Sequence, residues 1–98
     1  MIQSGYAGKI LKLDLSSGTS EEICTSDYAE RFIGGRGISA GLYWDLASFQ
    51  AGAFDPGNCL IIATGPVTGF SGLAGCRWTI CSRSPISSPE FFSYGNLG

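Results

Sequence analysis

In the stretch CRWTICS, residues 76–82, large apolar side chains alternate with polar ones at the central positions 77–80. This alternation predicts a β-strand. Trp78 and Ile80 point to one face of this strand, and Arg77 and Thr79 point to the other. The chain then passes through a Ser-Pro step to the glycine-containing run YGNLG at 94–98. The fold is therefore expected to rest on a sheet, with Arg77 on one of its faces.

Earlier in the chain, three more segments are typical of strands. The run CLIIA at 59–63 is apolar throughout and bounded by turn residues, which predicts a strand buried on both faces. Residues 9–15 alternate and predict a half-buried strand whose apolar face carries Leu11, Leu13 and Leu15. A turn then leads to a returning strand at 19–24, so these two segments form a hairpin.

Two short helices are predicted between the hairpin and the later strands. Residues 27–33 form the first, with Asp27 as N-cap, Glu30 completing a capping box and Gly34 as the stop signal. The second spans 38–46, where one apolar stripe is made by Ile38, Leu42 and Leu46. This order of elements favours the α+β class, an antiparallel-rich sheet with the two helices packed on one face.

Composition excludes several classes of function. The chain has 98 residues, 44% of them hydrophobic, which fits one small folded domain. Its net charge is −2 and its six lysines and arginines are scattered, which argues against nucleic-acid binding. No signal peptide is visible and no apolar run approaches the ~18 residues of a membrane span, so we expect a cytoplasmic protein with no membrane partner.

The sequence shows no residue pattern that is typical of a catalytic or metal site. It has no histidine, so a Ser-His-Asp or Cys-His mechanism cannot be completed within it. No Cys-x-x-Cys pair or metal-like spacing occurs, and we interpret all four cysteines as small buried apolar residues: Cys24, Cys59, Cys76 and Cys81. Catalytic and metal-ligating residues are therefore not predicted here, and chemistry must come from a cofactor or from other sequence.

The best candidates for a binding site are Arg77, Asn96 and Gly98. Arginine supplies a planar fork of donors for phosphate, and asparagine offers both a donor and an acceptor. Glycine lets backbone N–H groups approach a ligand closely. This set suits an anionic, hydrogen-bonding ligand, and the alternatives are a surface arginine on a half-exposed sheet and an asparagine in a turn.

Residues 35–40, GRGISA, formally fit the dinucleotide motif G-x-G-x-x-A. That motif must follow a strand in a βαβ unit, whereas here a helix is predicted before it. A corner between two helices is the favoured interpretation, with Arg36 as a candidate for contact with an anion. An unrelated nucleotide-binding α+β domain stays an alternative.

Several stretches, in the same order, resemble the N-terminal domain of aldehyde ferredoxin oxidoreductases. They are the opening GYAGKIL, then FIGGRGISA, then ATGPVTG, then Arg77 with the Ser-Pro step that follows it, and finally NLG at 96–98. Together they cover nearly the whole chain, which is far more specific than any one glycine-rich motif.

The resemblance implies a tungsten- or molybdenum-dependent enzyme that oxidises aldehydes to carboxylic acids and passes electrons through a [4Fe–4S] cluster to ferredoxin. In that family two pterin cofactors hold the metal through their dithiolenes, and the N-terminal domain is the platform for this bis-pterin cofactor. By matched position, Arg77 and the motif Asn96-x-Gly98 would contact the pterin and its phosphates. The cluster would be bound by sequence that is not present here.

The sequence pattern predicts no closing strand or helix before Gly98, so we expect residues 1–98 to be an incomplete, N-terminal portion of that cofactor-binding domain. Such a half domain would be inactive alone, and its partner would be the remainder of the enzyme. The alternative is a stand-alone binding module completed by a second copy of the chain. An open apolar face on the isolated half domain would favour such a homo-oligomer.

Overall fold

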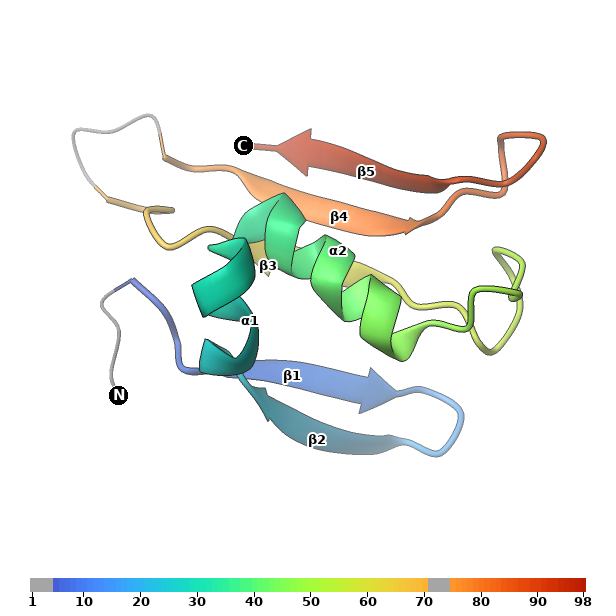
Figure 1. Cartoon of the computed structure of the whole chain (residues 1–98), viewed down its shortest axis with the longest axis horizontal. Helices are drawn as coiled ribbons and strands as arrows, with labels where there is room; N and C mark the ends of the chain where they lie inside the picture. Colours follow the sequence, from blue (N-terminus) through green and yellow to red (C-terminus); the bar gives the residue numbers. More distant parts are fainter. Residues whose placement is uncertain (1–4, 71–74) are drawn as a thin grey trace.

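The computed structural model describes residues 5–70 and 75–98, which form two helices and two antiparallel sheets. In chain order the elements are β1 (Lys9–Asp14), β2 (Thr19–Cys24), α1 (Ser26–Phe32), α2 (Gly35–Leu46), β3 (Ile61–Thr64), β4 (Trp78–Arg83) and β5 (Phe92–Leu97). In Figure 1 the β1–β2 hairpin lies on one side of the helices and the β3–β4–β5 sheet on the other. The predicted α+β class is confirmed, with the strands divided between two sheets.

The core lies where the two helices meet. Tyr28 and Ala29 of α1 pack with Ile38 and Leu42 of α2, and each is at most 8% exposed. The apolar stripe predicted for the second helix is confirmed, because Leu46 also packs against this cluster. α2 further contacts β3 and β4, so it connects the core to the larger sheet.

The helix boundaries differ from the prediction by a few residues. α1 begins at Ser26, and Thr25 stands in the N-cap position without a capping side-chain hydrogen bond. The predicted capping box of Asp27 and Glu30 is therefore wrong, since both residues already lie inside the helix. α2 begins at Gly35 and not at residue 38. Within residues 5–70 and 75–98, no helix is long and apolar enough to cross a membrane.

The leucine face of β1 is not the face that packs inward. Leu11 and Leu13 are 62% and 59% exposed, and Leu15, just beyond the strand, is 90% exposed. The opposite face is covered, because Ile10 pairs with Ile23 of β2 and both contact the helix cluster. Alternation separates the two faces of a strand, but it does not say which of them a neighbouring helix will cover.

The prediction that residues 59–63 are buried on both faces is wrong. The strand spans Ile61–Thr64 and packs on α2 through one face only. Ile61 contacts the core cluster, whereas Ile62 is 64% exposed on the other face, where it pairs with Ile80. The apolar run therefore marks a strand with one covered face and one open apolar face.

Residues Phe92–Leu97 form β5, which the sequence pattern does not predict. Glycine and asparagine at 95 and 96 have low strand propensity, and this masks the aromatic residues before them. Antiparallel pairing along β4 nevertheless supplies the strand with its ladder, and its register sets Thr79 opposite Asn96. This register decides where the predicted site residues meet.

A strained residue, Ile33, connects the two helices. Its φ is 67° and its ψ is −67°, and the Gly34 N–H donates to the Phe32 carbonyl at 2.7 Å across it. These residues form a γ-turn of the rare positive-φ type. The Tyr6 hydroxyl donates to the Ile33 carbonyl at 2.6 Å and helps to hold the turn. Since positive φ is unfavourable for a β-branched residue, strain is stored between α1 and α2.

We expect Ile33→Gly to preserve the stability or to raise the free energy of unfolding by up to about 1.5 kcal/mol. Glycine removes a Cβ clash worth roughly 1–2 kcal/mol, while its greater freedom in the unfolded chain costs roughly 0.5–1 kcal/mol. Little burial is lost, because Ile33 is 67% exposed. Urea unfolding measures the difference.

Ile62→Gly is the matched control, because Ile62 is 64% exposed but lies in a strand of ordinary backbone conformation. This variant should lose about 1 kcal/mol of stability. Equal losses in the two variants would contradict the strain assigned to Ile33.

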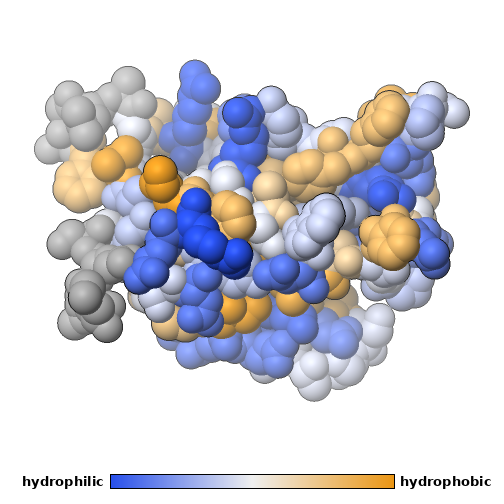
Figure 2. Space-filling model, viewed as in Figure 1, coloured by the Kyte–Doolittle hydropathy of each residue, from blue (hydrophilic) through white to orange (hydrophobic). Residues whose placement is uncertain are grey.

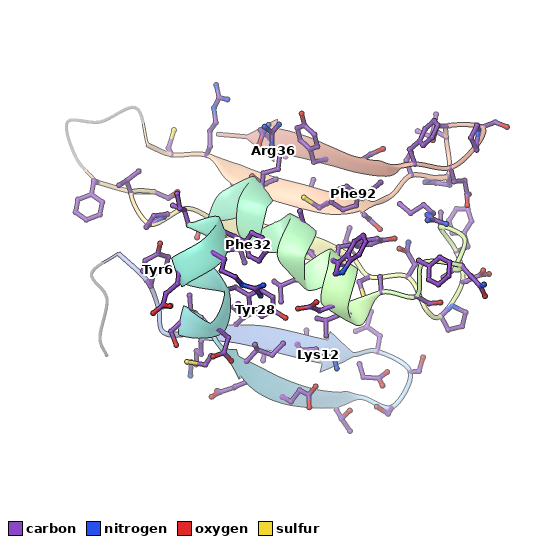
Figure 3. All side chains as sticks on the ribbon, viewed as in Figure 1. Tyr6, Lys12, Tyr28, Phe32, Arg36 and Phe92 are labelled. Atoms are coloured by element: carbon purple, nitrogen blue, oxygen red, sulfur yellow. The ribbon has the colours of Figure 1, made fainter. Side chains whose placement is uncertain are left out.

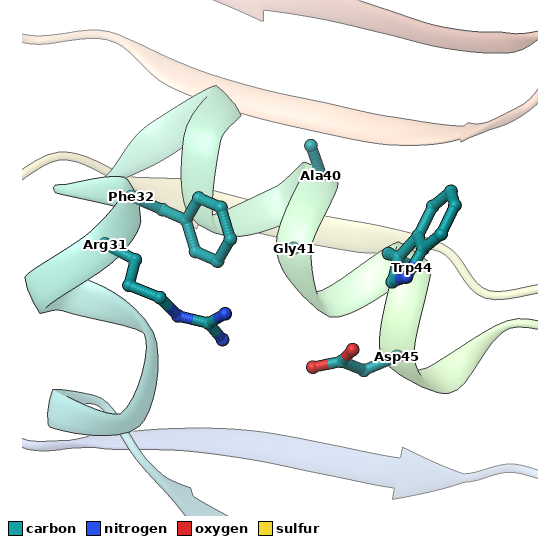
Figure 4. A pocket seen from close by; sticks show the side chains of 6 residues that line it. All are labelled: Arg31, Phe32, Ala40, Gly41, Trp44 and Asp45. Carbon is teal, nitrogen blue, oxygen red and sulfur yellow. The ribbon is translucent and has the colours of Figure 1, made fainter.

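The two helices approach each other closely through glycines of α2. A Cβ built on Gly37 would overlap the Phe32 carbonyl oxygen, and one built on Gly41 would lie 2.6 Å from Phe32 Cε2. Figure 4 shows the Phe32 ring of α1 facing α2 beside Gly41. The absence of side chains at these two positions lets the end of α1 rest on α2.

Candidate functional site

The sheet brings the three predicted site residues, Arg77, Asn96 and Gly98, to one end of the β4–β5 pair. Thr79 of β4 pairs with Asn96 of β5, and the strands are antiparallel. Continuing this register by two residues brings Arg77 opposite Gly98. A Cβ on Gly98 would lie 3.0 Å from Arg77 Cγ and 3.2 Å from Arg77 Cα. All three residues are exposed, so a ligand can reach them.

Asn96 is oriented by Thr79, which no sequence pattern marks as a site residue. The Thr79 hydroxyl donates to Asn96 Oδ1 at 3.1 Å, and Thr79 is only 6% exposed. This bond occupies the amide oxygen and leaves the amide N–H groups for a ligand. Only the register of β5, which no sequence pattern predicted, reveals this role of Thr79.

Gly98 lies directly against the segment that carries Arg77. Its missing side chain makes room for Arg77, since a Cβ would also lie 3.1 Å from the Cys76 carbonyl oxygen. These distances are tighter than ordinary van der Waals contacts. Gly98 is therefore in close contact with the backbone that carries Arg77, and its predicted approach to a ligand stays a prediction.

The glycine-rich turn at 65–69 fixes the other side of Arg77. The Thr68 hydroxyl donates to the Arg77 carbonyl at 3.2 Å and accepts from the Gly65 N–H at 3.0 Å. The turn also contacts the start of α2, because a Cβ on Gly34 would lie 2.7 Å from Pro66 Cδ. Segments far apart in the sequence thus meet beside Arg77.

Arg36, in the first turn of α2, lies over strand β5. Its guanidinium carbon is 4.2 Å from the centroid of the Tyr94 ring, which is a cation–π contact. Figure 3 places Arg36 where α2 meets the larger sheet. Tyr94 and Asn96 are two residues apart on β5 and share a face.

The charged side chains of the site are the positive guanidinium groups of Arg36 and Arg77. The ion pairs of the described residues, Lys9–Glu22 at 3.2 Å and Lys12–Glu21 at 2.7 Å, lie on the β1–β2 hairpin. No carboxylate in residues 5–70 and 75–98 forms an ion pair with Arg36 or Arg77. Guanidinium and amide donors suit a phosphate or another anion. The same part of the chain holds no group of three His, Cys, Asp or Glu side chains arranged for a metal ion.

The cysteines differ in part from the prediction that all four are buried. Cys81 is buried and Cys59 is half-buried, but Cys24 and Cys76 are exposed. Burial raises the pKa of the Cys59 thiol, and a hydrogen bond with the Ser26 hydroxyl lowers the pKa of the Cys24 thiol. The prediction is wrong for the two exposed cysteines, because Cys24 is the last residue of β2 and Cys76 lies two residues before the start of β4.

A hollow of about 370 Å³ lies between the two helices, apart from Arg77 and Asn96. Figure 4 shows Arg31 and Asp45 among the side chains that line it, together with Phe32 and Trp44. The Asp45 carboxylate already accepts a hydrogen bond from the Tyr28 hydroxyl at 2.7 Å. The hollow and the β4–β5 site are therefore separate features.

Comparison with known proteins agrees with the sequence resemblance. Residues 10–98 match the family model described as aldehyde ferredoxin oxidoreductase, N-terminal domain. Over 97 residues the chain is 41% identical to a tungsten-containing aldehyde ferredoxin oxidoreductase of Pyrococcus horikoshii, covering 96% of this chain and 15% of that protein. It is 34% identical over 87 residues to an aliphatic sulfonate oxidoreductase, WOR-like subunit, of Pyrococcus furiosus, covering 85% of this chain and 14% of the relative.

The chain thus spans about 15% of the length of the curated relatives it matches. The family model, by contrast, covers nearly the whole of this chain, including both helices, strands β2 to β5 and Arg77. On that match, the chain belongs to the aldehyde ferredoxin oxidoreductase N-terminal domain family.

Proposed function

We propose that this chain is the cofactor-holding platform of a tungsten- or molybdenum-dependent oxidoreductase of the aldehyde:ferredoxin type. The observation that carries the proposal is the meeting of Arg77, Asn96 and Gly98 on neighbouring strands, with the Asn96 amide turned by Thr79. This donor set suits the anionic parts of a bis-pterin cofactor and offers no direct ligand for its metal.

In this role the chain would bind and orient the cofactor. The Arg77 guanidinium would donate to a phosphate or to a polar edge of a pterin, and the Asn96 amide N–H groups would add a second donor beside it. Thr79 keeps that amide from rotating. When bound, the metal with its dithiolenes would supply the two-electron oxidation of an aldehyde to a carboxylic acid.

The remaining functions of the enzyme belong to sequence outside these residues. A [4Fe–4S] cluster and the contact with ferredoxin would come from the remainder of the protein, so the isolated chain would be inactive. We place this enzyme in the cytoplasm. The names of the relatives include both an aldehyde and a sulfonate oxidoreductase, so the substrate would be selected outside the shared domain.

An open apolar face supports the idea that the chain is part of a larger unit. On the face of the larger sheet away from α2, Ile62 and Leu97 are 64% and 52% exposed. Figure 2 shows a different face of the molecule, on which apolar side chains also lie at the surface among polar ones. We propose that the rest of the polypeptide covers this face. The alternative, a stand-alone module, would cover it with a second copy of the chain.

The test is the metal and pterin content of the full-length protein purified from its native host. We expect tungsten or molybdenum, with two pterins for each metal, measured by mass spectrometry of the metals and fluorescence of the oxidised pterins. A folded, full-length protein without metal or pterin would contradict the proposal. If the native host instead produces a protein of only these residues, a dimer in sedimentation analysis would favour the alternative.

A further inference from the structure

We propose that Arg36 is a second cation of the same site, so that Arg36 and Arg77 hold one anionic phosphate group between them at Asn96. This inference rests on the proposed function for the identity of the ligand, a pterin phosphate. The anion site itself rests on the geometry of the residues.

The strand geometry places Asn96 between the two arginines. Tyr94, Asn96 and Gly98 follow one another on a single face of β5 and its extension, with Arg36 above the first and Arg77 beside the last. At about 3.3 Å per residue, the ends of this row are roughly 13 Å apart. An arginine side chain spans about half of that distance, so both guanidinium groups can reach an anion at Asn96.

The contact with Tyr94 holds Arg36 in place over the strand. The guanidinium carbon lies 4.2 Å from the ring centroid, within the range of an effective cation–π interaction. Tyr94 is 51% exposed, so this ring serves Arg36 more than the core. A side chain stacked in this way loses less freedom when it binds an anion.

The positive charges of Arg36 and Arg77 favour the binding of a negatively charged group between them. Neither Arg36 nor Arg77 has an ion-pair partner among residues 5–70 and 75–98, and the Asn96 amide N–H groups have no acceptor there. A phosphate monoester carries about −1.5 to −2 charges at neutral pH and three acceptor oxygens. It therefore matches two guanidinium groups and an amide in both charge and hydrogen bonding.

Arg31 supplies an internal comparison. Its guanidinium carbon lies 4.9 Å from the centroid of the Phe32 ring, so it makes the same kind of contact on a different part of the surface. It lines the hollow between the helices and has no asparagine of the site beside it. If stacking on an aromatic ring were the whole role of Arg36, the two arginines would behave alike.

The experiment uses the full-length protein with the substitutions Arg36→Ala, Arg36→Lys and Tyr94→Leu, and Arg31→Ala as control. The first readout is the pterin and metal content per folded protein. The second is the affinity of cofactor-free protein for inorganic phosphate, measured by calorimetry. We expect Arg36→Ala to weaken phosphate binding by about tenfold or more and to lower cofactor content. Arg36→Lys should recover part of the affinity, and Tyr94→Leu should weaken it a few-fold.

The outcomes separate this inference from the proposed function. Equal phosphate affinity and cofactor content in Arg36→Ala and Arg31→Ala would overturn the role of Arg36, while loss of cofactor in an Arg77 variant would leave the proposed function standing. A wild-type protein that binds phosphate through Arg36 but contains neither pterin nor metal would support the anion site and contradict the proposed function. Circular dichroism of each variant verifies that it is folded.

Discussion

In the full-length protein, Arg77→Ala is expected to lose most of the metal and pterin while the fold persists. Arg77 is exposed and forms no ion pair with the described residues, so its removal leaves no buried charge behind. The substitution would remove a charge-assisted hydrogen bond worth about 1.5–3 kcal/mol, which corresponds to roughly tenfold to hundredfold weaker binding of the cofactor. Tungsten or molybdenum per protein after purification is the measurement.

Two neighbouring substitutions should follow in a defined order. Asn96→Ala should lower occupancy more mildly, because it removes a neutral donor and frees the Thr79 hydroxyl. Gly98→Val should be at least as damaging as Arg77→Ala, since its side chain would push against Arg77 Cγ.

Lys12→Ala is the control for this series. Lys12 is paired with Glu21 on the hairpin, in an exposed ion pair of small energetic weight. The cofactor content of the Lys12→Ala protein should equal that of the wild type. Full metal and pterin content in a folded Arg77→Ala protein would show that Arg77 is an ordinary surface arginine.

The second large effect is expected at Gly37, where Gly37→Ala should destabilise the protein by about 1–3 kcal/mol or more. In an unobstructed helix this change stabilises by about 1 kcal/mol, so the sign itself is diagnostic. The added Cβ would overlap the Phe32 carbonyl oxygen, and backbone cannot move aside as a side chain can. The urea midpoint of unfolding reports the change.

Gly41→Ala offers a graded comparison on the same helix. Its Cβ would meet the edge of the Phe32 ring at 2.6 Å, and that ring is the end of a side chain which can shift. We therefore expect a smaller loss than at Gly37. A gain of stability at Gly37 would mean that α1 does not rest on α2 at this point.

The helices and the β1–β2 hairpin could be predicted because their signals are local. The stripe of Ile38, Leu42 and Leu46 identifies α2, and a turn joins two alternating runs into the hairpin. Which face of each strand is covered depends on the helix placed against it, so the open sides of Leu11 and Ile62 could not be predicted.

The site shows the same division between local chemistry and pairing. Arg77, Asn96 and Gly98 could be chosen as candidates from residue types and from the family resemblance, and their role in binding stays a prediction. Their contact could not, because it depends on β5, whose Gly95 and Asn96 conceal a strand. Thr79 and Tyr94 have no distinguishing signal in the sequence, and only the register gives them roles beside the site.

The place of β5 at the border of its sheet has a thermodynamic consequence. Among the described strands, β5 pairs with β4 alone, so one ladder of hydrogen bonds holds it. A ligand gripped by both Arg77 and Asn96 would join the two strands and oppose their separation. At a hundredfold excess over its dissociation constant it would raise the free energy of opening by about 2.7 kcal/mol. Amide hydrogens of β5 would then exchange with solvent about a hundredfold more slowly, and their exchange rate would report how much of the protein carries cofactor.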